Sequence, residues 1–192
     1  GGLWDKYPVE QVATPEGYAR NPELVINFYN ERRKQLLDVV PNAGHLGVAD
    51  LERDFNVTVV TQNVDNLHER AGSTHVIHLH GELTKVCSSR DPYNPHFVKE
   101  LAPEEYEVKL GDKAGDGTQL RPFIVWFGES VPEIETAIRY VEQADIFVII
   151  GTSLNVYPAA GLLNYVPRAA EVYLIDPKPV DTHVMRPIHV IQ

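Results

Sequence analysis

Polar side chains gather at the ends of two apolar runs in the middle of the chain. Gln62, Asn63 and Asp65 follow the run VTVVT, and His80 closes the run HVIHLH. Because the carboxyl ends of parallel strands meet at one edge of a sheet, these groups should share a crevice. An imidazole titrates near neutral pH, so His80 could accept a proton from a sugar hydroxyl without a large pKa shift. The residues alone leave open a second interpretation, in which His80 is a core histidine with a satisfied hydrogen bond.

Histidines recur along the second of these runs. Alternation along a strand predicts that His78 faces away from His75 and His80. Five residues of strand separate His75 from His80 by about 17 Å, which is too far for one metal ion. Cys87 is the single cysteine of the sequence, which excludes an intrachain disulfide and a zinc site built from cysteine pairs. We therefore predict that the chain holds no metal.

A second set of candidate ligand-binding groups follows a later apolar run, ADIFVII. The turn Gly151-Thr152-Ser153 lies between this run and a predicted helix, where backbone N–H groups and hydroxyls can meet a phosphate or a ribose. Asp176 ends the run EVYLID, where a ribose acceptor would be useful. A tight turn with a helix cap is an equally good interpretation of Gly151.

Tyr29 and Arg32 lie three residues apart on a helix predicted over residues 22–39, and so they share a face. On geometry alone, the simple interpretation is that Tyr29 packs at the edge of the core. Arg32 would then form a salt bridge at the surface.

Short apolar runs alternate with helical patterns from residue 57 onward. Capping residues predict helices that begin after Thr14, Asn21 and Asn42, and Gly72 is predicted to close a short helix in a left-handed conformation. A further helix is predicted over residues 132–144. Strands are predicted at residues 57–62, 75–80, 145–150, 171–176 and 188–191. This order predicts an α/β fold with a Rossmann-like, doubly wound parallel sheet.

Composition limits the class of protein. The 192 residues include 27 acidic and 17 basic side chains, and a net charge of −10 argues against nucleic acid as the main partner. No apolar run reaches the roughly 18 residues of a membrane span, and no signal peptide opens the chain, so we expect a cytoplasmic protein. Residues 84–120 are rich in proline, glycine and charge, which indicates a small inserted subdomain. Because the chain opens on a loop-like Gly-Gly, we expect further residues upstream.

Four segments carry a resemblance to a known family. TQNVDNLHERAG, HLHGEL, RPFIVWFGE and IIGTSLNVYPAA, in this order, resemble the sirtuins, which are NAD-dependent protein-lysine deacylases. GLW followed by ATPEGYARNPELVINFYNERR is similar to the bacterial and mitochondrial branch that also removes succinyl and malonyl groups. The likeness covers the chain apart from residues 88–118. It implies removal of acetyl, and of succinyl or malonyl, groups from protein lysines, with release of nicotinamide and O-acyl-ADP-ribose.

The resemblance also implies roles for individual residues. His80 would be the catalytic base that deprotonates a ribose hydroxyl. The groups that would hold NAD are Gln62, Asn63, Val64, Asp65, Gly151, Thr152, Ser153 and Asp176, the last at a position where the family usually has asparagine. The segment that would pair with the substrate backbone as an added strand is Val125, Trp126, Phe127, Gly128 and Glu129. Tyr29 and Arg32 match a pair that holds the acyl carboxylate, a good clamp of phenol and guanidinium.

Besides Asp176, the chain departs from the family in its phosphate loop and in its zinc cysteines. The glycine-rich phosphate loop, Gly-Ala-Gly-x-Ser, and its strand are missing from the sequence, and the four zinc cysteines of many sirtuins are reduced to Cys87. An alternative function is therefore a non-catalytic module that binds NAD, ADP-ribose or acyl-lysine, and ADP-ribosyl transfer to protein is a third. The expected parts are a loop entering the NAD site (1–21), a helical part with the acyl-pocket helix (22–56), Rossmann core (57–83), the subdomain (84–120) and Rossmann core (121–192).

Overall fold

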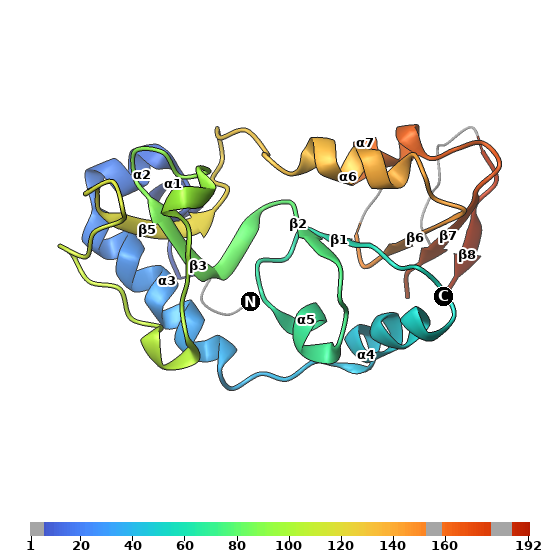
Figure 1. Cartoon of the computed structure of the whole chain (residues 1–192), viewed down its shortest axis with the longest axis horizontal. Helices are drawn as coiled ribbons and strands as arrows, with labels where there is room; N and C mark the ends of the chain where they lie inside the picture. The colour runs from blue at the N-terminus through green and yellow to red at the C-terminus, as the bar shows by residue number, and fades with distance from the viewer. Residues whose placement is uncertain (1–5, 153–158, 178–185) are drawn as a thin grey trace. The chain divides into compact units, whose positions relative to one another are not determined.

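The computed structural model describes residues 6–152, 159–177 and 186–192 (Figure 1). Contacts divide the chain into two compact units, which we call the first unit (residues 1–132) and the second unit (residues 133–192). None of the helices among the described residues is long and apolar enough to cross a membrane.

Most of the first unit's helices lie in its first part. They are α1 (Val9–Val12), α2 (Pro15–Arg20), α3 (Pro22–Leu36), α4 (Ala43–Asp50), the 3-10 helix η2 (Leu51–Arg53) and α5 (Leu67–Ala71). Three of them, α2, α3 and α4, start directly after the predicted capping residues Thr14, Asn21 and Asn42. The side chain of Thr14 accepts a hydrogen bond from the N–H of Gly17 before α2, and Asn21 caps α3 in the same way. These side-chain acceptors satisfy N–H groups that the first helical turn leaves without partners.

Helix α3 supplies much of the core of the first unit. Val25, Phe28 and Tyr29 lie in one buried cluster with Trp126, a residue from the distant segment that follows β5. The Tyr29 side chain is 0 % exposed. The simple interpretation that Tyr29 packs at the edge of the core is therefore wrong, because Trp126 covers it.

Two short parallel strands carry the polar groups predicted at strand ends. β1 (Val59–Thr61) pairs with β2 (Val76–His78), and α5 connects them. Gly72 closes α5 with φ of 113°, as predicted, because glycine adopts this left-handed conformation without steric cost. The strands are shorter than the predicted 57–62 and 75–80.

A three-stranded antiparallel sheet follows, in the order β4-β3-β5. Its strands are β3 (Gly81–Ser88), β4 (Lys99–Glu100) and β5 (Leu120–Ile124), with 3-10 helices η3 (Pro95–Phe97) and η4 (Pro103–Glu105) between them. Gly81 has φ of 89°, and a Cβ there would lie 2.1 Å from the carbonyl oxygen of Phe123. Only glycine fits this approach, so the chain turns from the parallel pair directly into β3.

A hydrogen-bond network ties the end of β3 to the turn before β5. The Ser88 hydroxyl, 0 % exposed, donates to Oδ2 of Asp116 at 2.5 Å, and Thr118 donates to Oδ1 of the same carboxylate at 2.6 Å. The Ser88 oxygen also accepts from the N–H groups of Arg90 and Asp91. This network, which we call the Ser88 network, joins the two ends of the subdomain through two hydroxyls and one carboxylate.

Replacing Ser88 with alanine is expected to lower the free energy of unfolding by about 0.5–1.5 kcal/mol, because it removes the acceptor of the part-buried N–H groups of Arg90 and Asp91. Urea denaturation measures the change, with the exposed Ser130→Ala as the matched control. We also expect a chelator to leave the wild-type unfolding curve unchanged. Equal midpoints for Ser88→Ala and Ser130→Ala, or destabilisation by the chelator, would contradict this account of the subdomain.

The second unit is built around a parallel sheet in the order β6-β7-β8 (Figure 1). Its elements are α6 (Ile134–Val141), β6 (Ile146–Ile150), α7 (Ala159–Leu162), the 3-10 helix η5 (Leu163–Tyr165), β7 (Glu171–Ile175) and β8 (His189–Ile191). The strands predicted at 145–150, 171–176 and 188–191 are confirmed to within one residue at each end. Helices alternate with parallel strands, so the predicted α/β, Rossmann-like class is confirmed.

Candidate active site

The residues after β1 form what we call the strand-end loop, residues 62–65. Thr61 is the parallel partner of His78, and the N–H of Leu79 donates to the carbonyl of Thr61 at 3.0 Å. The strand-end loop and His80 therefore leave neighbouring strands at the same edge, as predicted. The imidazole of His80 hydrogen bonds to the backbone carbonyl of Gln62. The structure thus brings together two of the residues that the sequence placed in one site.

His80 is half-buried, and this burial is the main influence on its ionisation. Burial lowers the pKa of the imidazole below its ordinary value of 6.5, against the smaller opposing effect of the Gln62 carbonyl. The ring is therefore neutral at neutral pH. One ring nitrogen donates to Gln62, and the other can accept a proton, which is the state a general base needs.

Backbone hydrogen bonds hold the strand-end loop itself. The N–H of Asn63 donates to Oγ1 of Thr61 at 3.0 Å, and the N–H of Leu83 donates to the carbonyl of Val64 at 2.8 Å. The carboxylate of Asp65 accepts from the N–H of Leu67 at 3.0 Å, which gives the first N–H of α5 an acceptor. Asn63 is exposed, while Gln62, Val64 and Asp65 are half-buried. A loop fixed through its backbone leaves the Asn63 amide available to a ligand.

The predicted orientation of His78 is wrong. Its Nδ1 lies 3.1 Å from the carbonyl oxygen of Asn63, so its ring reaches the same loop as His80. Residues two apart on an extended chain share a face, and the alternation therefore places His78 with His80. His75 hydrogen bonds instead to Oγ1 of Thr58.

The segment 125–129, predicted to pair with a substrate backbone, is anchored at several points. The N–H of Val125 donates to the carbonyl of His80 at 2.9 Å, and the N–H of Phe127 donates to Ala13 at 3.0 Å. The N–H of Trp126 donates to the carboxylate of Glu129 at 2.8 Å. The groups that face solvent are Phe127, 69 % exposed, and Gly128.

The Glu129 carboxylate forms an ion pair with Arg121 on β5, which ties the segment to that strand. Its Oε2 lies 2.9 Å from Nη1 of Arg121, and Tyr93 donates its hydroxyl to Oε1 at 2.9 Å. The Arg121 guanidinium stacks 3.8 Å from the ring centroid of Trp126. Glu129 therefore holds the segment in place, and its role toward substrate stays a prediction.

The two residues of the predicted carboxylate clamp differ in their surroundings. The Tyr29 hydroxyl donates to the carbonyl of Val12 at 2.9 Å and accepts from Nε1 of Trp126 at 3.0 Å, and burial raises its pKa to about 12. Arg32 is half-buried, with its guanidinium 5.8 Å from the ring centroid of Phe28. Burial lowers the pKa of Arg32 to about 10, which leaves it charged at neutral pH. Sequence reasoning missed Trp126 as a partner of Tyr29, because 97 residues separate them.

The second unit places the other predicted cofactor residues at strand ends. Gly151 is exposed, has φ of 65° and leaves open space where a Cβ would stand, which suits a tight turn after β6. Thr152 follows it, and Ser153 lies outside the described residues. Asp176 follows β7, and its N–H donates to the carbonyl of Ile191 at 3.0 Å.

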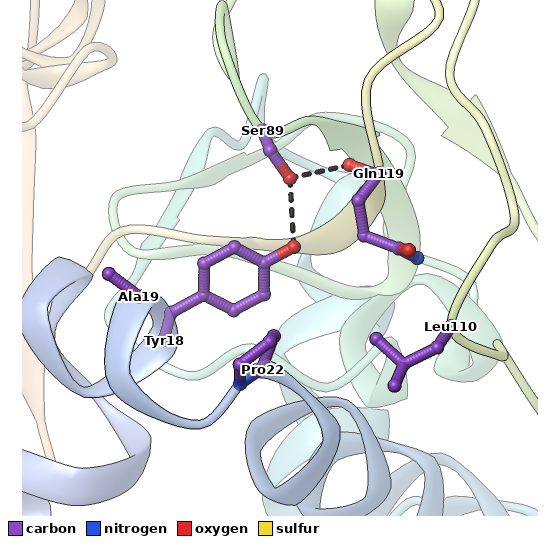
Figure 2. Close-up of a pocket in the computed structure, with 6 residues that line it drawn as sticks. All are labelled: Tyr18, Ala19, Pro22, Ser89, Leu110 and Gln119. Carbon is purple, nitrogen blue, oxygen red and sulfur yellow. Dashed lines mark hydrogen bonds between the residues drawn. The ribbon is translucent and has the colours of Figure 1, made fainter.

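Figure 2 shows a hollow on the first unit that involves none of the predicted site residues. It is lined by Tyr18, Ala19, Pro22, Ser89, Leu110 and Gln119. The hydroxyls of Tyr18 and Ser89 lie 2.9 Å apart, and Ser89 donates to the carbonyl of Gln119. These polar groups bond to one another, so we assign the hollow no chemistry.

The fold and the strand-end site define an α/β protein with a polar site at the carboxyl ends of parallel strands. The family model of the Sir2 family matches residues 1–158. A protein of Bacteroides thetaiotaomicron named NAD-dependent protein deacylase is 84 % identical over 192 residues, which is 100 % of this chain and 82 % of the relative. The chain belongs to the Sir2 family.

Solved structures agree with this assignment. A serine-to-alanine mutant of a Sir2 homologue in complex with ADP-ribose is 36 % identical with a TM-score of 0.83, covering 98 % of this chain and 76 % of that chain. A complex of a Sir2 homologue with NAD is 37 % identical with a TM-score of 0.80, and the match covers 98 % of this chain and 74 % of that chain.

Proposed function

We propose that this protein removes acyl groups from lysine side chains of proteins in an NAD-dependent reaction. Family membership and the 84 % identical deacylase support this activity. The observation that carries it is the half-buried imidazole of His80, with its lowered pKa, hydrogen bonded to Gln62 beside the exposed Asn63. An enzyme of this class needs a neutral base at the edge of a nucleotide site.

The side chains present fit NAD as the cofactor. In the first unit, the Asn63 amide and the Asp65 carboxylate offer partners for amide and hydroxyl groups, and Gln62 and Val64 complete the strand-end loop. In the second unit, the open space at Gly151 would let a phosphate approach the backbone of the turn, with Thr152 after it in the sequence. Ser153, which lies outside the described residues, would extend this turn. Asp176 would accept a ribose hydroxyl.

When bound, NAD would supply ribose hydroxyls and a carbon from which nicotinamide can leave. The Gln62 carbonyl would orient the His80 ring through one nitrogen, so that the other nitrogen takes the proton of a ribose hydroxyl. Segment 125–129 would present Phe127 and Gly128 to the substrate backbone. The backbone hydrogen bonds that fix the strand-end loop and segment 125–129 would favour reaction, because prior positioning lowers the entropic part of the activation barrier.

For the acyl group, we extend the proposal to succinyl and malonyl lysine. The half-buried guanidinium of Arg32 supports it, because a positive charge partly removed from water binds a carboxylate more strongly than an exposed one. The phenol of Tyr29, on the same face of α3, would complete the clamp.

The function is tested with the full-length protein and one peptide that carries either acetyl-lysine or succinyl-lysine. We expect both peptides to lose their acyl group only when NAD is present, with one nicotinamide and one O-acyl-ADP-ribose formed per lysine. Chromatography with mass spectrometry measures all the products. Deacylation without NAD would refute the proposal, and NAD binding without nicotinamide release would favour the non-catalytic module. A mass gain on the peptide would indicate ADP-ribosyl transfer.

A further inference from the structure

His78 is a buried histidine with a hydrogen-bond partner at each ring nitrogen. Its side chain is 5 % exposed. Nδ1 lies 3.1 Å from the carbonyl oxygen of Asn63 in the strand-end loop, and Nε2 lies 2.7 Å from Oε2 of Glu69 on α5. The ring thus connects the loop that carries the Asn63 amide to the helix that follows it.

Both of these partners can only accept. A backbone carbonyl has no proton to donate, and neither has an ionised carboxylate. A neutral imidazole carries one N–H, so it can satisfy Asn63 or Glu69 but not both. The observed geometry therefore requires the imidazolium, which donates from both nitrogens.

The charges around the ring agree with this protonation state. Burial by itself lowers the pKa of His78, but the hydrogen bond and charge of Glu69, together with the Asn63 carbonyl and the charge of Glu82, raise it overall. Burial likewise raises the pKa of Glu69, but the bond from His78 lowers it overall. Among the described residues, His68 on α5, whose own pKa is lowered mainly by burial, and Lys85, which pairs with Glu82, also act on this group.

We propose that His78 is a positioning residue for the deacylation reaction, because its two hydrogen bonds fix the strand-end loop beside His80. The loss of either bond frees the Asn63 carbonyl or leaves Glu69 without its partner, and the loop can then move away from His80. The inference rests on the proposed function, since the strand-end loop matters only if it binds NAD.

The same geometry gives the sign of the pH dependence. The pKa of His78 in the folded protein is above its ordinary value of 6.5, so both bonds are present below that value and one is lost as pH rises through the raised pKa. His80 acts as a base only when its ring is neutral, so its protonation limits activity at low pH. His78 should therefore govern an alkaline decline in kcat/KM for NAD.

The cluster of Glu69, His78 and Glu82 also has to be distinguished from a metal site. The ligand atoms of Glu69, His78 and Glu82 lie within 4.8 Å of one another. However, the short bond to Glu69 occupies Nε2, the ring nitrogen that would face an ion, and Glu82 pairs with Lys85 at 2.7 Å. This arrangement is that of an ion pair.

The experiment compares full-length wild-type enzyme with Glu69→Gln and with a matched control, Glu82→Gln. Both variants remove one negative charge near His78, but Glu82 lies 3.8 Å from Nε2 and makes no short bond to it. Measurements are kcat and KM for NAD from pH 6 to pH 9 with one acetyl-lysine peptide. A glutamine amide can accept from the imidazolium and donate to the neutral ring, so in Glu69→Gln the Nδ1 N–H of His78 stays on the Asn63 carbonyl at every pH. We therefore expect Glu69→Gln to lose the alkaline decline, with kcat/KM for NAD within about twofold of the wild type at pH 6 and several-fold above it at the alkaline end. Glu82→Gln should follow the wild type.

A third variant, His78→Gln, removes the titrating group. It should lower kcat/KM for NAD at every pH and abolish the alkaline decline, with KM for the peptide unchanged. Equal loss for Glu69→Gln at all pH values, with only a lower melting temperature, would show a purely structural role and overturn the inference. So would an effect of added zinc or of a chelator on the wild type that is absent in Glu69→Gln.

These outcomes separate the inference from the function on which it rests. A wild-type protein without NAD-dependent deacylation would refute the proposed function. An active wild type whose Glu69→Gln variant matches Glu82→Gln at every pH would refute the role of His78 alone.

Discussion

Replacing His80 with alanine is expected to lower kcat for deacylation by about a thousandfold, because a positioned general base contributes typically 10²–10⁴ in rate. The His80 ring is the half-buried imidazole that hydrogen bonds to Gln62, and alanine cannot take the proton that the proposed reaction requires. Binding of ADP-ribose should persist, since the strand-end loop keeps its backbone bonds to Thr61 and Leu83. Steady-state kinetics and calorimetric titration with ADP-ribose measure the two effects.

The matched control for this variant is His75→Ala. His75 lies on the same stretch of chain, is half-buried and hydrogen bonds to Thr58, away from the strand-end loop. Its kcat should stay within about twofold of the wild type. Turnover retained by His80→Ala, or lost equally in His75→Ala, would remove His80 from the proposed mechanism.

The pH profile of the wild type tests the same residue independently. His80 acts as a base only when neutral, so kcat/KM should fall as pH drops through its pKa. Because burial lowers that pKa, the midpoint of the acid limb should lie below 6.5 and should be absent in His80→Ala. A wild-type midpoint above 6.5 would contradict this role.

Local sequence signals predicted a large part of the fold. Thr14 and Asn21 cap helices where proline follows at the first helical position, and Gly72 adopts the predicted left-handed conformation. These features depend on neighbours within a few residues, so the sequence carries the information directly. The strands of the second unit were predicted for the same reason, since each is a short apolar run between turns.

The features that escaped prediction depend on distant neighbours. The antiparallel pairing of β3 with β5 joins segments more than thirty residues apart, and it requires Gly81 against the Phe123 carbonyl. Trp126 donates to Tyr29 across 97 residues. Strand-end positions and the resemblance to a family together supplied the candidate site residues, but their hydrogen-bond partners required coordinates. His78 is the clearest case, because its two partners decide its charge.

Replacing Arg32 with methionine is expected to lower kcat/KM for the succinyl-lysine peptide by about a hundredfold, since hydrogen bonds to charged groups contribute about 1.5–3 kcal/mol. Deacetylation should change by less than about threefold, because an acetyl group carries no carboxylate. Methionine keeps much of the length of the side chain, and so its packing near Phe28. The measurement is the ratio of kcat/KM for the two peptides.

The matched control is Lys34→Met, which removes one positive charge from an exposed position on the same helix. That variant should leave the ratio for the two peptides unchanged, because its ammonium is in water and screened. An equal loss on both peptides in Arg32→Met would indicate a general disturbance of α3, and the clamp assignment would then fail.

Tyr29→Phe should reduce desuccinylation less than Arg32→Met does. The Tyr29 hydroxyl donates its single proton to the carbonyl of Val12, so it can donate to an acyl carboxylate only by giving up that bond. If the Tyr29 hydroxyl leaves the Val12 carbonyl for the acyl carboxylate, the net gain in binding energy is only the difference between those two hydrogen bonds. Arg32 brings a positive charge to the carboxylate and should therefore contribute more. A larger loss in Tyr29→Phe would mean that succinyl binding separates the phenol from Val12, and that the segment carrying α1 moves when substrate binds.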